Sequence, residues 1–314
     1  MVRRVVAAAL AVVVVAGGGY LLLRQADDLL DPAGSCEVRI GDDSVSLQPE
    51  QAQNAALIAG IGVRRELPVR AVAVALATVY QESKIVNVDY GDRDSLGLFQ
   101  QRPSQGWGTA EQVQDPGYAT KAFYDALVRV DGYRRLPIHE AAQEVQRSAD
   151  GSAYEQHETN ARLLAQALTG RTRAALSCDV DDPDDSGQAE EADGLTDNAR
   201  ALRGDVRSTF GRLPEGGYAP GGVSTGHKAG SAHYDGRAID FFFRPIGGAR
   251  TRHGWALAHY LVARATMLDI RTVIFDEPIW TSRRSGEGWR EYDVTGSGDP
   301  DVLLHRDHVH VDVA

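Results

Sequence analysis

One strongly acidic segment divides the chain and limits how it can fold. Residues 179–194 read DVDDPDDSGQAEEADG and are almost free of apolar side chains. A stretch of this kind cannot bury enough apolar surface to fold on its own. We therefore predict a solvated linker, with one domain at residues 36–178 and a second at 195–314, a division that the 314-residue length allows.

The first residues predict a membrane anchor. Two arginines precede an almost unbroken apolar run from Val5 to Leu23, which is near the length that spans a bilayer. Positive charges before the run place the N-terminus in the cytoplasm. We expect a single-pass anchor at residues 1–24, a spacer at 25–35 and the bulk of the chain outside the cytoplasm. A cleaved signal peptide, giving a secreted protein, is the alternative, but residues 17–20 form a poor cleavage site.

The net charge bears on which partners the chain can bind, and the cysteine content bears on whether it has a disulfide. The net charge is −11 and no long basic run is present, so nucleic acid is not an expected partner. The two cysteines, Cys36 and Cys178, bracket the first predicted domain. An extracytoplasmic location permits a disulfide between them, which would contribute up to roughly 4–5 kcal/mol in the chain-entropy model by closing a long loop. Two unpaired buried thiols are the alternative.

The pattern of apolar residues differs between the two predicted domains. The first is mainly α-helical after a hairpin signal around Gly41, and the second is α+β. In the first domain we expect helices at 68–82, 116–129, 138–148 and 153–169. In the second we expect helices at 196–210 and 252–268, and strands at 238–243, 271–275 and 308–313.

Histidine and aspartate residues form a constellation in the second domain. His308 and His310 alternate with valines in the last strand, so both imidazoles point to the same face. Asp240 lies in another expected strand and His233 in the turn before it. Three ligands of these types, with one open position, are what a catalytic zinc site needs.

These residues also resemble a known superfamily. Residues 231–240 carry the pattern Ser-x-His-x-x-Gly-x-Ala-x-Asp in full, which is the zinc motif of D-alanyl-D-alanine carboxypeptidases. The closing His308-x-His310 is similar to the murein endopeptidase, lysostaphin and Hedgehog branch. The resemblance implies a small antiparallel sheet that holds Zn2+ through His233, Asp240 and His310, and metal-assisted hydrolysis of an amide.

The resemblance leaves the proton acceptor open. It implies that His308 is the catalytic histidine, whereas the carboxypeptidase branch has a glutamate as general base where this chain has Asp307. Either Asp307 or His308 is therefore a candidate to take the proton. Arg237 is a candidate to orient a substrate carboxylate, with surface solvation as the alternative.

A second resemblance lies in the first domain. Glu82-Ser83 ends an apolar helix, and Gly-Leu-Phe-Gln at 97–100 and Asp-Pro at 115–116 follow in order. This set is similar to the lysozyme-like fold of soluble lytic transglycosylases over residues 49–170. It implies that Glu82 is the catalytic acid/base, since a carboxyl at the end of an apolar helix can have a raised pKa and donate a proton. It also implies that Phe99 and Gln100 line a glycan cleft.

Two features of this domain bear on whether its glycan-cleaving site is complete. The family's Ala-Tyr-Asn element is replaced by Val-Gln-Arg-Ser at 145–148, although Tyr154 is close in sequence. Glycoside hydrolysis normally uses two carboxylates, and Asp89, Asp92 and Asp94 are candidates for the second. The alternative is that these aspartates form a polar turn, while a lytic transglycosylase needs only one carboxylate.

Both resemblances point to the same polymer. The first domain is expected to act on or bind glycan and the second to cut peptide, and peptidoglycan contains both. The sequence thus predicts a bacterial membrane-anchored peptidoglycan hydrolase with a zinc metallopeptidase domain. The alternative is a non-catalytic cell-wall-binding or scaffold protein with degenerate domains, which the altered Ala-Tyr-Asn element and Asp307 favour.

Overall fold

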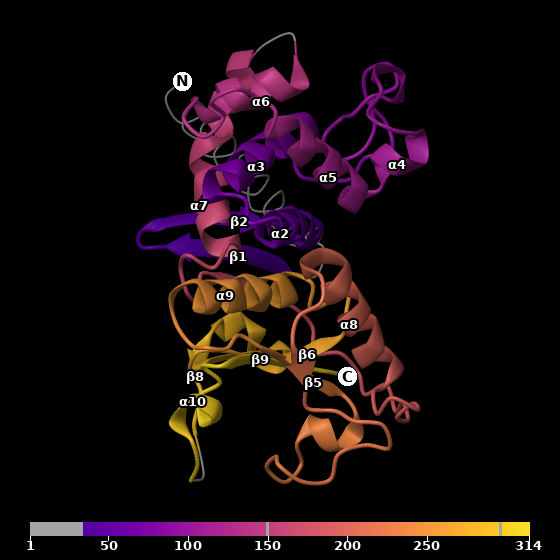
Figure 1. Cartoon of the computed structure of the whole chain (residues 1–314), viewed down its shortest axis with the longest axis vertical. Coiled ribbons are helices and arrows are strands. Elements are labelled where there is room, and N and C mark those ends of the chain that lie inside the picture. Colours follow the sequence, from indigo (N-terminus) through magenta and orange to yellow (C-terminus); the bar gives the residue numbers. More distant parts are fainter. Residues whose placement is uncertain (1–33, 149–150, 295–296) are drawn as a thin grey trace, which may run out of the picture. The chain divides into compact units, whose positions relative to one another are not determined.

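The structure is a computed structural model that describes residues 34–148, 151–294 and 297–314. Residues Ser35–Ala314 form one compact unit (Figure 1). This unit contains helices and two antiparallel sheets, so the expected combination of helices with antiparallel sheet is confirmed.

The N-terminal part has a three-stranded antiparallel sheet in the order β2-β1-β3, together with a group of helices. The strands are β1 (Ser35–Ile40), β2 (Asp43–Leu47) and β3 (Leu176–Asp179). The α-helices are α2 (Pro49–Arg64), α3 (Val69–Ser83), α4 (Ala110–Gln114), α5 (Pro116–Leu127), α6 (Ile138–Gln146) and α7 (Glu158–Leu168), and the 3-10 helices are η1 (Pro103–Gln105) and η2 (Gly151–His157). The hairpin around Gly41 is formed by β1 and β2.

Helix α3 illustrates why the helices lie where the sequence predicts them. Pro68 is its N-cap, and the apolar residues that follow are buried from Ala71 to Val79. The helix ends because Lys84 adopts a left-handed conformation, after which the backbone N–H of Ile85 donates to the Val79 carbonyl at 3.0 Å. This termination places Glu82 in the last turn of the helix.

The predicted disulfide between Cys36 and Cys178 is confirmed. The two residues are direct partners in the antiparallel pairing of β1 with β3. Both side chains are buried, so the bond joins the two ends of the N-terminal part inside its core.

The C-terminal part contains a six-stranded antiparallel sheet in the order β4-β5-β9-β6-β7-β8. Its strands are β4 (Glu215–Gly216), β5 (Ala238–Phe242), β6 (Ile270–Ile274), β7 (Pro278–Thr281), β8 (Arg290–Glu291) and β9 (His308–Val313). Its helices are α8 (Asp197–Phe210), α9 (Gly248–Ala263), α10 (Pro300–Leu303) and the 3-10 helices η3 (Ala232–Asp235) and η4 (Ser282–Glu287). Helices α8 and α9 contact the central strands (Figure 1).

The acidic segment 179–194 is largely exposed, as its composition predicts. It nevertheless makes defined contacts with the C-terminal part. Arg271 donates to the Pro183 carbonyl at 3.0 Å, and Ser186 donates to the Ala314 carbonyl at 2.9 Å. Asp193 forms an ion pair with Arg203 at 2.9 Å.

The expectation of a membrane-anchored chain is corrected here. Within residues 34–148, 151–294 and 297–314, no helix is both long and apolar enough to cross a membrane. The run from Val5 to Leu23, on which the expected anchor depends, lies outside the described residues. A membrane location therefore has no part in the function proposed below.

A buried histidine links α9 to segments of the N-terminal part. His259 is fully buried; its Nδ1–H donates to the Ala167 carbonyl at 2.8 Å, and its Nε2 accepts the Ala175 N–H at 3.0 Å. This arrangement requires the neutral ring. Burial accordingly lowers the pKa of His259 to about 4.

Stability should therefore fall as the pH drops from about 6.5 to 4. In that window the unfolded His259 binds a proton and the folded one does not, which costs on the order of 3 kcal/mol by pH 4. We expect His259→Gln to be less stable than the wild type at pH 7, with a much smaller difference at pH 4.5. Urea unfolding at both pH values measures this, and an equal difference at both would contradict it.

Candidate metal centre

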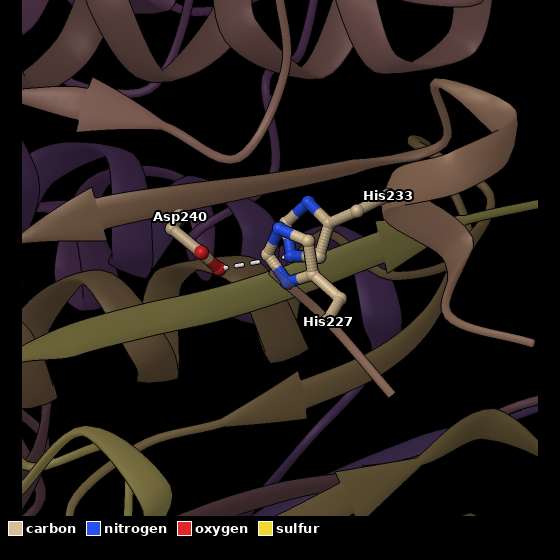
Figure 2. A group of neighbouring side chains, drawn as sticks. All are labelled: His227, His233 and Asp240. Carbon is tan, nitrogen blue, oxygen red and sulfur yellow. Dashed lines mark ion pairs between the residues drawn. The ribbon is translucent and has the colours of Figure 1, made fainter. Parts of the chain in front are cut away.

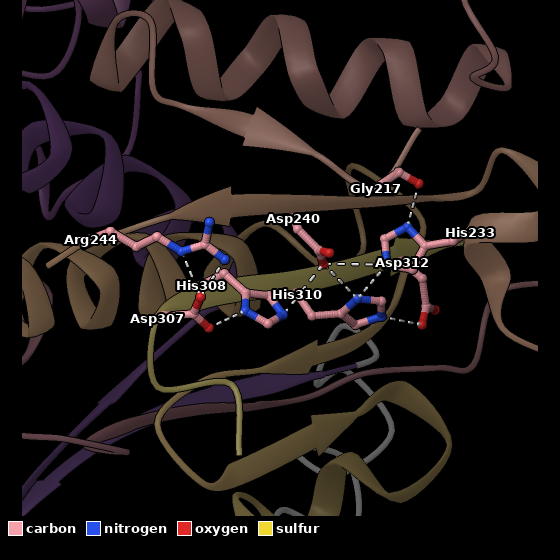
Figure 3. Close-up of polar contacts among 8 residues, drawn as sticks. All are labelled: Gly217, His233, Asp240, Arg244, Asp307, His308, His310 and Asp312. Carbon is pink, nitrogen blue, oxygen red and sulfur yellow. Dashed lines mark hydrogen bonds and ion pairs between the residues drawn. The ribbon is translucent and has the colours of Figure 1, made fainter. Parts of the chain in front are cut away.

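Strand register brings three predicted ligands into one site. Strands β5 and β9 pair so that Asp240 lies directly opposite His310 (Figure 3). The same register places Phe242 opposite His308. Because side chains alternate along a strand, the valines of β9 face the core while His308, His310 and Asp312 face the other way. The turn η3, just before β5, adds His233 to the same face.

The donor atoms of His233, Asp240 and His310 lie at separations that suit a zinc ion. His233 Nε2 is 3.1 Å from His310 Nδ1 and 3.3 Å from Asp240 Oδ1, and His310 Nδ1 is 3.0 Å from the same oxygen. Ligand atoms 2.0–2.1 Å from a tetrahedral zinc are about 3.3 Å apart. All three side chains are buried, and the three atoms can therefore hold one ion.

A backbone contact orients His233. Its Nδ1–H donates to the Gly217 carbonyl at 2.8 Å, which leaves Nε2 free to accept at the centre. Gly217 has φ of +82°, and a Cβ there would lie 2.3 Å from the His233 ring. Outer contacts of this kind fix the tautomer of a metal-binding histidine. Glycine at 217 was not predicted, because it contributes only a backbone atom.

Asp312 lies behind His310, as the Gly217 carbonyl lies behind His233. His310 Nε2 lies 3.4 Å from Asp312 Oδ2, so Nδ1 is the nitrogen that faces the centre. Burial alone would lower the pKa of His310, but hydrogen bonds with Asp240 and Asp312 raise it to about 9. Burial would raise the pKa of Asp240, yet hydrogen bonds with His233 and His310 hold it well below its ordinary range.

A different trio, His227, His233 and Asp240, also places its ligand atoms close together (Figure 2). The His227 and His233 rings are stacked, however, with centroids 3.9 Å apart and an interplanar angle of 23°. Imidazole lone pairs lie in the ring plane, so nearly parallel rings cannot both direct them at one ion. The His310 ring meets His233 at 64°, and this favours His310 as the third ligand.

His308 and Asp307, the two candidates for the proton acceptor, occupy different positions. His308 Nε2 lies 3.8 Å from Asp240 Oδ1, at the centre, and its Nδ1 contacts Asp307 Oδ1 at 2.6 Å. Asp307 Oδ2 accepts from Arg244 Nε at 2.7 Å (Figure 3). Burial would raise the pKa of Asp307, but its bonds to His308 and Arg244 lower it. Asp307 thus lies behind His308 rather than at the centre.

His305 is a further histidine beside the site, and no role was predicted for it. Its ring centroid lies 4.7 Å from that of His308 and 5.8 Å from that of His310. Burial and the neighbouring histidines lower its pKa to about 3, so the ring is neutral at physiological pH. Its backbone is left-handed, with φ of +52°, which turns the chain from α10 into β9.

Arg237, the candidate for orienting a substrate carboxylate, forms hydrogen bonds with other residues of the protein. It donates to the Val313 carbonyl at 3.1 Å and to Asp235 at 3.0 Å, and its side chain is 20% exposed. These contacts hold the end of β9 against the turn before β5.

In the N-terminal part, Glu82 accepts a hydrogen bond from a buried tyrosine. Tyr154, which η2 supplies, donates its hydroxyl to Glu82 Oε1 at 2.6 Å. Burial, and to a smaller extent this bond, raises the pKa of Tyr154, so the hydroxyl keeps its proton. Ser83 donates to the Leu98 carbonyl at 2.8 Å and ties the end of α3 to the following loop.

The other residues of the predicted glycan cleft lie close to this point. Phe99 is fully buried and stacks on Phe123 with ring centroids 4.6 Å apart, and its carbonyl accepts from Gln146 at 2.8 Å. Gln100 is partly exposed and donates to the Tyr90 carbonyl at 3.1 Å. Phe99 and Gln100 as cleft residues stay predictions.

The three candidates for a second carboxylate differ in their contacts. Asp94 accepts hydrogen bonds from Arg102 at 2.7 Å and from the Ser104 N–H at 2.8 Å. Both bonds lower the pKa of Asp94, and the bond from Ser104 has the larger effect. Asp92 is 91% exposed, next to Arg93. Asp89 is also exposed. Asp94 therefore holds the loop together through its charge.

The sequence is similar to one family in part of its length. A family model described as the VldE C-terminal domain matches residues 191–302, about a third of the chain. The matched stretch contains His233 and Asp240 and ends before β9. No curated protein matches the sequence.

Proposed function

We propose that this protein is a peptidoglycan hydrolase whose C-terminal part is a zinc metallopeptidase for cell-wall peptide. The observation that supports it most is the convergence of His233 Nε2, Asp240 Oδ1 and His310 Nδ1 at 3.0–3.3 Å from one another. Two imidazoles and one carboxylate leave a fourth position open, as catalytic zinc sites do.

In this proposal each residue around the centre has a distinct task. Bound zinc supplies Lewis-acid activation of water and of the scissile carbonyl. His308 takes the proton from the attacking water and returns it to the leaving amine, since its Nε2 faces the centre. Asp307 orients the His308 ring and stabilises its protonated form.

For the N-terminal part we propose glycan binding or cleavage, with Glu82 as proton donor. Tyr154 holds the Glu82 carboxyl through its Oε1 oxygen. Tyr154 thereby gives this chain a tyrosine beside the acid even though the Ala-Tyr-Asn element is replaced. Cleavage would then follow the single-carboxylate route of the lytic transglycosylases that the sequence resembles.

Digestion of purified peptidoglycan tests both activities. We expect the zinc-loaded protein to release soluble peptide products, and His308→Ala to lower that rate by at least about 100-fold while keeping its zinc. Of the two variants, only Glu82→Gln should fail to release anhydro-muropeptides. Mass spectrometry of the products and metal analysis provide the readouts.

The same digestion distinguishes a hydrolase from the alternative, a non-catalytic scaffold protein. A protein that binds peptidoglycan in a sedimentation assay but releases neither product would be a scaffold with degenerate domains. A preparation that takes up no zinc and releases no peptide would rule out the peptidase.

A further inference from the structure

The loop between α5 and α6 presents three arginines that the protein does not pair with its own acidic groups. Arg129, Arg134 and Arg135 are all exposed. Within residues 34–148, 151–294 and 297–314, none of their guanidinium groups donates a hydrogen bond or forms an ion pair. Asp125, the acidic residue of α5, is already paired with Arg65 at 2.5 Å. The three positive charges are therefore available to a partner.

The backbone of this loop is held in place by consecutive turns. The Tyr133 N–H donates to the Val130 carbonyl at 3.3 Å, and the N–H groups of Arg135 and Leu136 both donate to the Gly132 carbonyl, at 2.8 and 3.1 Å. The Tyr133 side chain is buried and anchors the loop to the core. The arginines thus project from a fixed backbone, which lowers the entropy that is lost when they bind a ligand.

The loop also forms a hollow of about 440 Å³. Sites for small ligands have volumes of roughly 300–1,000 Å³, so the hollow is large enough to hold part of a ligand. Its walls include Arg134 and Arg135, the exposed Val128 and one carboxylate, that of Asp131. The guanidinium groups outnumber the carboxylate, so this hollow is positively charged on a chain whose net charge is −11. It is suited to an anion.

The type of cation indicates the type of anion. All three cations are arginines, and the planar fork of a guanidinium matches two oxygens of a phosphate. A single contact at an exposed arginine contributes little to affinity, so a useful affinity requires several phosphates on one chain. Single-stranded nucleic acids also stack their bases on aromatic rings, but the ring of Tyr133 is buried below Arg134, 5.8 Å from its guanidinium carbon. These features favour a phosphate polymer without bases.

We propose that the loop between α5 and α6 binds a polymer of polyol or sugar units joined by phosphodiesters. Arg129, Arg134 and Arg135 contact successive phosphates of one chain. This is a binding function in addition to the hydrolysis proposed above, and it uses neither Glu82 nor the metal centre.

The test measures how the affinity for such a polymer depends on salt. The probe is poly(glycerol phosphate), titrated calorimetrically into the full-length protein at several salt concentrations. Three phosphate contacts on a flexible chain predict that the logarithm of the affinity falls with the logarithm of the salt concentration with a slope of about −2. Arg134→Gln combined with Arg135→Gln should weaken binding at least about tenfold and make the slope shallower by roughly 1 to 1.5.

Two further variants separate a specific site from a general effect of charge. Arg39→Gln combined with Arg283→Gln removes the same charge from two arginines that are 60% and 83% exposed, and it should keep wild-type affinity. Asp131→Asn removes the carboxylate from the hollow and should tighten binding, a gain that damage to the fold would not produce.

Several results would overturn this inference. The wild type may not bind the polymer at low salt, or the control pair may weaken binding as much as the loop pair does. Oligothymidylate or poly-L-glutamate of the same length that binds as tightly would assign the effect to general charge attraction. The loop pair should digest purified peptidoglycan, free of phosphate polymer, at the wild-type rate, so the outcome is independent of the proposed hydrolase function.

Discussion

Replacing Asp240 with alanine should weaken zinc binding by well over 100-fold. Asp240 Oδ1 is the atom that contacts all three histidines of the site, at 3.3 Å from His233, 3.0 Å from His310 and 3.8 Å from His308. Loss of an outer partner of a metal ligand already costs 10- to 100-fold in affinity, so loss of a ligand should cost more. Competition with a chromogenic chelator measures the affinity directly.

A neighbouring aspartate provides the control for this variant. Asp235 belongs to the same turn, is 61% exposed and pairs with Arg237 at 3.0 Å. Asp235→Ala should retain wild-type zinc affinity. Circular dichroism of both variants establishes that they fold, and wild-type affinity in a folded Asp240→Ala would refute the ligand assignment.

Removing the disulfide should produce the largest loss of stability. The bond between Cys36 and Cys178 closes a loop with a sequence separation of 142. In the chain-entropy model a loop of this length contributes about 5 kcal/mol by restricting the unfolded chain. This is comparable to the whole stability of many domains, so Cys36→Ala with Cys178→Ala should unfold at a much lower urea concentration.

Reduction provides an independent measurement of the same bond. Dithiothreitol should destabilise the wild type by a similar amount and leave the double variant unchanged. If oxidised and reduced wild type unfold at the same urea concentration, the bond does not restrict the unfolded chain as expected.

Long periodic segments were predicted well, because the signal lies within the segment itself. The alternation of histidine and valine predicts the last strand at 308–313, and β9 has these bounds. Pro68 and the apolar residues after it likewise predict α3, which begins at Val69. Strands β4 and β8 have two residues each, too short for a period to appear, and they were not predicted.

Site residues that act through distant contacts were harder to predict. Gly217 acts through a carbonyl, and Arg244 meets Asp307 across 63 positions of sequence. Neither has a local pattern that distinguishes it from a turn glycine or a surface arginine. The same limit applies to Tyr154, which reaches Glu82 across 72 positions.

The sequence by itself determined which residue types are available for chemistry and which strand faces carry them, because alternation and motif spacing are local properties. It therefore led to His233, Asp240, His308 and His310 as candidate site residues. Only the tertiary structure decided which ring nitrogen faces the centre and that Asp307 lies behind His308. Those outcomes depend on the register of β5 against β9 and on Arg244, and long-range packing sets both.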